Sequence, residues 1–211
     1  MSEQIDLKGL EKKAWRSTYQ DGIWDIYFGM LILGMALAPY GENFGLPSEL
    51  GSMIVVFCID LMAVIFLILG KKYITIPRIG FVKFGVRRKR IKKYLLGFLI
   101  FNLLLAFVFL FADVSGIFNF FNIEGIIRPL VVGLLLITVP LSLLAYFLGY
   151  QRLYIYAIFF GLGLFFSDVL YPFVGSPLDL LLGEGLTGIV AIIIGLAYLV
   201  KFLHKYPISK K

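Results

Sequence analysis

The chain has 211 residues, of which 60% are hydrophobic and 16% are charged, and its mean hydropathy is +0.93. Soluble domains are about half apolar and about a quarter charged, so this composition excludes an ordinary soluble domain and favours an integral membrane protein. The net charge of +7 arises from 20 basic and 13 acidic residues. A single cysteine, Cys58, and a single histidine, His204, give no basis for a disulfide framework, and we expect no metal site and no cofactor.

Residues 1–22 form a polar and amphipathic segment ahead of the first apolar run. A helix over residues 5–20 would carry its apolar side chains roughly on one side: Ile5, Leu7, Leu10, Ala14 and Trp15. Its basic residues would then lie near lipid phosphates, as in helices that rest in the membrane interface. We therefore expect a cytoplasmic amphipathic segment here, with a short solvated helix as the alternative.

Six apolar runs have the length of a spanning helix, which needs about 20 residues. They cover residues 23–40, 50–70, 95–113, 129–149, 153–172 and 183–203. The sequence therefore predicts an all-α integral membrane protein with one transmembrane domain over residues 23–203. We expect its six helices to form three consecutive helical hairpins, followed by a basic cytoplasmic tail over residues 204–211.

Basic and acidic residues alternate between the connections. The two termini and the connections after the second and fourth runs hold 19 of the 20 basic residues. The connections after the first, third and fifth runs are acidic, with Glu42, Glu49, Asp113, Glu124, Asp179 and Glu184. Because basic loops stay on the cytoplasmic side, we expect a multi-pass protein of the cytoplasmic membrane with both termini in the cytoplasm.

Asp60 lies near the middle of the second run, with no basic residue at a similar depth in another run. A carboxylate at the bilayer centre costs at least about 2.5–3.5 kcal/mol, and burial favours its neutral, protonated form. Two interpretations follow: a group that exchanges a proton or binds a cation, or a neutral group that hydrogen-bonds to a neighbouring helix. Asn102, Thr138 and Ser142 fall at compatible depths, so we predict an intramembrane polar site formed by these four residues.

Two further acids, Asp21 and Asp25, lie at the inner edge of the first span. Residues four apart share a face of a helix, so both side chains are expected to point the same way. We expect them to pair with Arg16, with Arg78 or with the basic connection that follows the second span.

That connection, residues 71–94, is a basic cytoplasmic loop. Its mixture of β-branched residues, Pro and Gly predicts two short extended segments around residues 77–80. Six charges then follow closely: Arg87, Arg88, Lys89, Arg90, Lys92 and Lys93. Such a cluster attracts anionic lipid head groups at about 1 kcal/mol per residue. The alternative is that its positive charge only orients the helix bundle in the membrane. We expect no nucleic-acid partner.

Small residues recur at intervals of four on the last two spans. They are Thr187, Ala191 and Gly195 on the sixth, and Ala157 with Gly161 and Gly163 with Ser167 on the fifth. Such stripes let helices approach closely. They predict packing within the chain or the face of a homodimer.

No motif in the sequence fixes a reaction. His204 is far along the chain from the membrane serines, and no metalloprotease or phosphate-binding motif occurs. We therefore expect no catalytic residues and favour a small transport or permeation protein with a polar site around Asp60. The alternative is a non-catalytic module that binds anionic lipid or a protein partner through the basic face, and a lipid-modifying membrane enzyme comes third.

Overall fold

The computed structural model describes residues 19–45, 47–79 and 127–207, and every element within these ranges is a helix. Five of its helices are long and apolar enough to cross a membrane: Ile23–Phe44, Leu50–Ile79, Pro129–Leu148, Arg152–Val174 and Leu178–Lys205. The prediction of an all-α fold is thereby confirmed for the described residues, and the length and composition of these helices are compatible with a membrane protein. The predicted span at 95–113 and the amphipathic segment ahead of residue 19 lie outside the described residues, so six spans and three hairpins stay predictions.

The first part of the chain folds into two long helices. Helix α2 (Ile23–Leu37) begins after Gly22, whose φ of 77° suits a residue without a side chain, and it continues as the 3₁₀ helix η1 (Ala38–Phe44). Helix α3 (Ser48–Gly70) continues as the π-helical turn η2 (Lys71–Thr75) and then as α4 (Ile76–Ile79). The prediction of extended segments is therefore wrong for residues 77–79, which extend the second span as a helix.

The last part of the chain contains three further helices. The first consists of α7 (Ile127–Val132), the π-helical turn η3 (Gly133–Thr138) and α8 (Val139–Leu148), and it ends at Gly149, with φ of 66°. Helix α9 (Arg152–Val174) follows directly. The third consists of α10 (Leu178–Leu180), the π-helical turn η4 (Leu181–Gly185) and α11 (Leu186–Lys205).

Two prolines follow π-helical turns. Proline lacks an amide hydrogen, and its ring clashes with the carbonyl four residues earlier in a regular helix. For Pro77 that carbonyl belongs to Tyr73 in η2, and for Pro140 it belongs to Leu136 in η3. The wider turn relieves this clash, so both helices continue through their prolines. At Pro77 the sequence pattern had predicted extended backbone instead.

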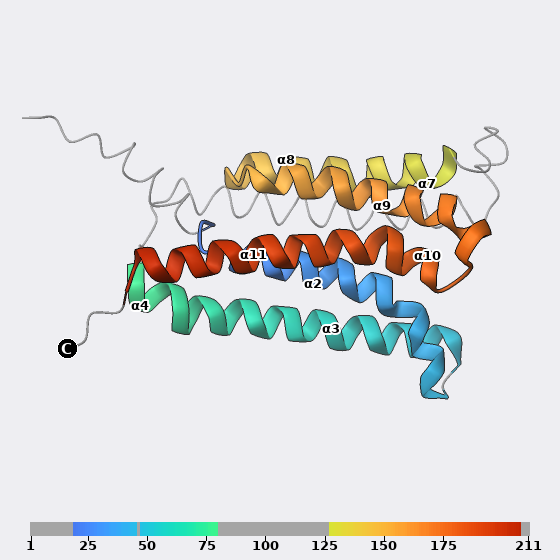
Figure 1. The fold of residues 1–211 in the computed structure, drawn as a ribbon, viewed down its shortest axis with the longest axis horizontal. Coiled ribbons are helices and arrows are strands. Elements are labelled where there is room, and N and C mark those ends of the chain that lie inside the picture. Colours follow the sequence, from blue (N-terminus) through green and yellow to red (C-terminus); the bar gives the residue numbers. More distant parts are fainter. Residues whose placement is uncertain (1–18, 46, 80–126, 208–211) are drawn as a thin grey trace, which may run out of the picture.

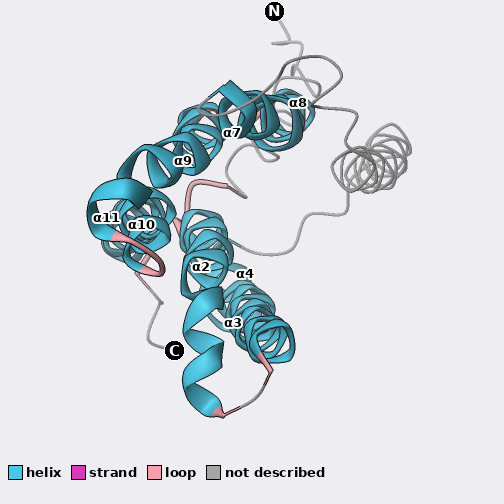
Figure 2. Ribbon diagram, turned by 90° about the vertical axis from the view of Figure 1, so that its right-hand side faces the viewer, coloured by secondary structure: helices cyan, strands magenta, loops and turns pink. Residues whose placement is uncertain are grey.

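The described helices form one curved row in the order α3, α2, α11, α9 and α8 (Figures 1 and 2), and neighbours in this row pack against each other. We call the end that holds α4 and the last turn of α11 the inner end, and the end that holds η1 and α10 the outer end (Figure 1). The exposed side of α3 is strongly apolar, since Met53 and Phe57 are 67% and 66% exposed. Such exposure suits a hydrocarbon environment.

Glycines set the distance between α2 and α11. A Cβ atom at Gly29 would lie 2.7 Å from the carbonyl oxygen of Gly188, and one at Gly22 would lie 2.1 Å from that of Gly195. Backbones this close leave no room for a side chain at these positions. Helix α2 is thereby held between α3 and α11, where its acidic first turn meets three other segments.

Candidate functional site

The carboxyl group of Asp60 points from the middle of α3 toward α2. Its residue is half-buried, and a Cβ atom at Gly34 of α2 would lie 3.3 Å from Oδ1. That oxygen is buried and has no hydrogen-bond partner among the described residues. A buried polar atom without a partner is uncommon in folded proteins, which makes Asp60 a candidate for binding an ion or a proton.

The other members of the predicted polar site lie elsewhere or outside the described residues. The hydroxyl of Thr138 donates to the carbonyl oxygen of Ala157 in α9 at 2.9 Å, while Ser142 is half-buried in α8. Helices α3 and α8 lie at opposite ends of the row (Figure 2), so the structure does not bring Asp60 to Thr138. Asn102 lies outside the described ranges, so its part in a polar site stays a prediction.

Asp21 is completely buried at the inner end, where it joins the first turn of α2 to η2. Its Oδ2 atom lies 2.5 Å from Nζ of Lys71 and accepts a hydrogen bond of 2.5 Å from the hydroxyl of Thr75. Its Oδ1 atom accepts a 3.2 Å hydrogen bond from the backbone N–H of Ile23. This carboxylate therefore compensates a cation and also stabilises the start of α2, where negative charge is favourable.

Asp25 is also completely buried, but it binds a different set of partners. The phenols of Tyr150 and Tyr156 both donate to Oδ1, the second at 2.6 Å, and Nη2 of Arg152 lies 2.9 Å from Oδ2. Arg152 also donates to the backbone oxygen of Tyr19 at 2.6 Å. Asp25 thus connects α2 to the turn between α8 and α9 and to the beginning of α9.

The sequence indicated one of the two basic partners and missed the other. Lys71 belongs to the basic connection, whereas Arg152 lies in the turn between the fourth and fifth spans. Arg78, another expected partner, donates instead to the backbone oxygen of Ile74 at 3.0 Å. Arg16 lies outside the described residues.

Aromatic side chains surround this charged cluster. The Arg152 guanidinium lies 3.7 Å from the ring centre of Tyr198 on α11, and the rings of Tyr19 and Tyr150 stack at 5.5 Å. Burial, followed by the charge of Asp25 and the hydrogen bond to it, raises the pKa of the Tyr150 phenol. The cluster is buried, and its acidic and basic side chains compensate each other's charge. Such an arrangement suits a structural role, in which it holds the helices together, more than a catalytic one.

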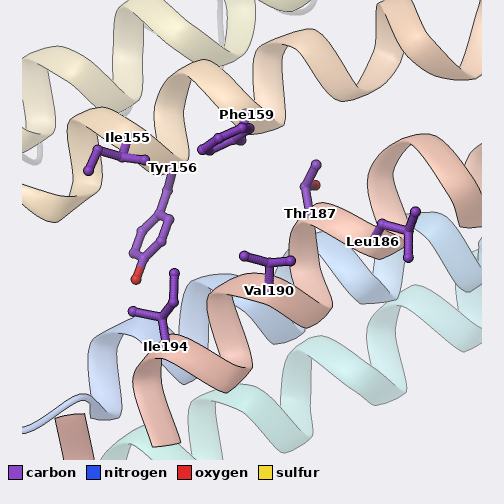
Figure 3. A pocket seen from close by; sticks show the side chains of 7 residues that line it. All are labelled: Ile155, Tyr156, Phe159, Leu186, Thr187, Val190 and Ile194. Carbon is purple, nitrogen blue, oxygen red and sulfur yellow. The ribbon is translucent and has the colours of Figure 1, made fainter. Parts of the chain in front are cut away.

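An apolar pocket of about 240 Å³ lies between α9 and α11 (Figure 3). Its lining comprises Ile155, Tyr156, Phe159, Leu186, Thr187, Val190 and Ile194. Tyr156 lines this pocket from α9 (Figure 3). Its phenol donates a hydrogen bond to Asp25. The lining is almost entirely apolar, and its side chains with a polar atom are those of Tyr156 and Thr187.

Glu184 is the buried acid that sequence reasoning missed. The sequence placed it at the edge of an external connection, but α10 and η4 extend the last span outward to Leu178, so Glu184 lies inside the helix. It is 1% exposed, and neither carboxyl oxygen has a hydrogen-bond partner among the described residues. The apolar run Leu180–Leu182 ahead of it is the signal that could have indicated the earlier start.

No group of three or more His, Cys, Asp or Glu side chains suited to a metal ion occurs within the described part of the chain. Comparison with protein-family models, with curated proteins and with solved structures finds no match to this chain. Its function is therefore argued from the chemistry of the buried acids.

Proposed function

We propose that the protein is a small transport protein that moves protons or small cations across the membrane, with Asp60 as the ion-binding group. One observation carries the proposal: Oδ1 of Asp60 is buried in the middle of a spanning helix and has no hydrogen-bond partner among the described residues. A group that serves only to pack two helices is expected to satisfy its hydrogen bonds with the neighbouring helix. On the α2 side, a Cβ atom at Gly34 would lie 3.3 Å from Oδ1, and Gly34 itself offers no side-chain donor.

The energetic argument favours a group that changes its protonation or binds a cation. A permanently charged carboxylate at this depth costs at least about 2.5 kcal/mol without a partner. Uptake of a proton or a cation removes that penalty, and release restores it. A site with two states of similar free energy is what a carrier needs in order to load and unload its ion.

The test is ion flux in proteoliposomes that contain the full chain, driven by a diffusion potential and followed with a pH-sensitive dye. We expect Asp60→Asn to lower proton or cation flux by at least about 10-fold, because an amide cannot exchange a proton. The matched control is Asp168→Asn, which alters an exposed acid near the outer end of α9. Wild-type flux in a correctly folded Asp60→Asn protein would overturn the proposal.

Asp60→Glu separates loss of the acid from loss of the fold. It restores a carboxyl group at nearly the same place, so we expect partial recovery of flux. If Asp60→Asn fails to fold while Asp60→Glu folds and has wild-type flux, the proposal stands. If Asp60→Glu folds and has no flux above empty liposomes, it fails.

Exposed basic residues at the inner end favour a second candidate, a module that binds anionic lipid. Lys72, Lys201 and Lys205 are exposed there, in addition to the predicted cluster over residues 87–93, which lies outside the described residues. Each basic residue near such a surface adds about 1 kcal/mol of attraction. Changing these three lysines to Gln should reduce retention of phosphatidylglycerol over phosphatidylcholine by the purified protein, and unchanged retention would count against this candidate.

A further inference from the structure

Glu184 is a second ionisable group inside the membrane span, close to the outer end. Its side chain is 1% exposed, and both Oε1 and Oε2 are buried without a hydrogen-bond partner in the described part of the chain. It lies in the π-helical turn η4, between Gly183 and Gly185. Such turns occur frequently at functional sites.

The elements packed against η4 present small, uncharged residues to this turn. From α9, Gly163 allows the carboxyl group to approach closely, since a Cβ atom there would lie 2.7 Å from both Cδ and Oε2 of Glu184. Ser167 of α9 donates its hydroxyl to the backbone oxygen of Gly163 at 3.0 Å. From α2, the contact is with Ala36, which lies beside Gly185.

The ionisable groups of the surrounding elements do not compensate Glu184 either. Asp179 on α10 is buried and is itself an acid, and Asp168 on α9 is exposed. On α2, Asp25 is bound at the inner end by Arg152. The basic residues of α11 are confined to its last turns, also at the inner end.

An unpaired carboxylate in this setting is strongly unfavourable. Removing a charge from water costs several kcal/mol unless a partner or hydrogen bonds compensate it. A divalent cation needs several oxygen ligands, and no group of three or more His, Cys, Asp or Glu side chains suited to a metal ion includes Glu184 among the described residues. A proton needs only the carboxyl group itself.

We propose that Glu184 is a proton-binding site in the outer half of the membrane domain, where the carboxyl group holds an exchangeable proton between α9 and η4. The site stands on its own geometry and does not depend on ion transport through Asp60. Its ligand is the proton.

The first test is labelling of the full chain in membranes with dicyclohexylcarbodiimide, which reacts with protonated carboxyl groups in apolar surroundings. The acid transfers its proton to one carbodiimide nitrogen, its oxygen bonds to the central carbon, and the adduct rearranges to a stable N-acylurea without a leaving group. Peptide mass spectrometry should locate the adduct on Glu184, with a yield that falls as the pH rises. Glu184→Gln should lose this adduct, whereas Asp168→Asn should retain it.

Infrared spectroscopy detects the proton on Glu184 directly, without a reagent that must reach the side chain. A protonated carboxyl group gives a C=O stretching band that shifts in heavy water, and we expect one such band in the wild type to be lost in Glu184→Gln. If the wild type and Glu184→Gln show the same bands at every pH from about 5 to about 9, Glu184 holds no proton and the proposal is wrong. Loss of flux in Asp60→Asn leaves this result untouched, so the two proposals fail separately.

Discussion

Asp21 and Asp25 lie one helical turn apart, and each is held by a different part of the chain. Asp21 is compensated by Lys71 and Thr75 at the end of the second span, and Asp25 by Arg152 and two tyrosines. Buried ion pairs often add little net stability, but loss of one partner leaves a buried charge uncompensated. These residues therefore matter most for keeping the helices in their correct relative positions.

The Asp21–Lys71 pair gives a prediction at this scale. Changing Lys71 to Met leaves the fully buried Asp21 carboxylate without its cation, and we expect a loss of about 3 kcal/mol in the free energy of unfolding. The double variant Asp21→Asn with Lys71→Met should recover most of this loss. Unfolding in mixed micelles measures the free energy of unfolding of the single and the double variant. The control is Lys72→Met, at the exposed neighbouring residue. Equal effects of Lys71→Met and Lys72→Met would contradict the assigned pair.

Tyr150 predicts how stability depends on pH. Its pKa in the folded protein is raised by burial and by Asp25, above the ordinary value of about 10 for a phenol. The unfolded chain therefore releases this proton at a lower pH than the folded chain. The stabilising contribution is complete below the ordinary pKa and is lost progressively as the pH rises above it.

The measurement is the free energy of unfolding between neutral and strongly alkaline pH. Above about pH 10, we expect Tyr150→Phe to reduce the slope by up to about 1.4 kcal/mol per pH unit, the value for one proton. Tyr146→Phe, at a ring that is 71% exposed, is the matched control. A slope in Tyr150→Phe identical to that of the wild type would show that Tyr150 does not cause the alkaline loss.

At the scale of the elements, the contact between α2 and α11 depends on residues without side chains. A Cβ atom at Gly195 would lie 2.7 Å from Cγ1 and 2.8 Å from the backbone nitrogen of Ile26. Ala157, Gly161, Gly163 and Ser167 are likewise buried in contacts within the chain. A homodimer face formed by the same stripes is not tested by a single chain and stays a prediction.

Replacing Gly195 with Leu should separate these two helices. We expect a loss of at least about 3 kcal/mol in the free energy of unfolding, because backbone atoms cannot move aside as a flexible side chain can. Ala197→Leu introduces the same side chain two residues later, on the exposed side of α11, and should leave stability nearly unchanged. A similar stability for both variants would show that the close contact does not hold the helices together.

The elements also show how far sequence reasoning reaches. Apolar runs of about 20 residues identified the five described spans, because a spanning helix must bury its backbone polar groups. The ends of the spans were harder to predict. The second span continues as a helix through Pro77 because of the π-helical turn η2, and hydropathy does not detect such turns. The extension of the last span to Leu178 was missed for a related reason, since Asp179 and Glu184 resemble loop residues until their burial is known.

The candidate sites were only partly accessible from the sequence. Asp60 was identifiable because an acid within an apolar run is unusual whatever surrounds it. The partners of Asp25 were not, since Tyr156 is 131 residues away along the chain and only the folded arrangement of the helices brings its phenol to Asp25. Contacts of this kind depend on the order of the helices, which hydropathy and charge do not determine.

At the scale of the whole molecule, the charges of the described residues separate toward the two ends of the helix row. Lys72, Lys201 and Lys205 are exposed at the inner end, while Glu42 is exposed at the outer end. The positive-inside rule therefore predicts that the inner end faces the cytoplasm. The orientation in turn decides which side Glu184 would exchange its proton with, because η4 lies near the outer end.

Labelling of single introduced cysteines tests this orientation directly. Cys58 is the one cysteine of the sequence, so Cys58→Ser gives a background free of thiols. In intact cells, a maleimide that cannot cross membranes should label Glu42→Cys in η1, at an exposed outer position. Gln151→Cys, in the exposed turn between α8 and α9, should react only after the cells are permeabilised. The reverse pattern would place the basic end outside and would assign the buried Glu184 to the cytoplasmic half of the membrane.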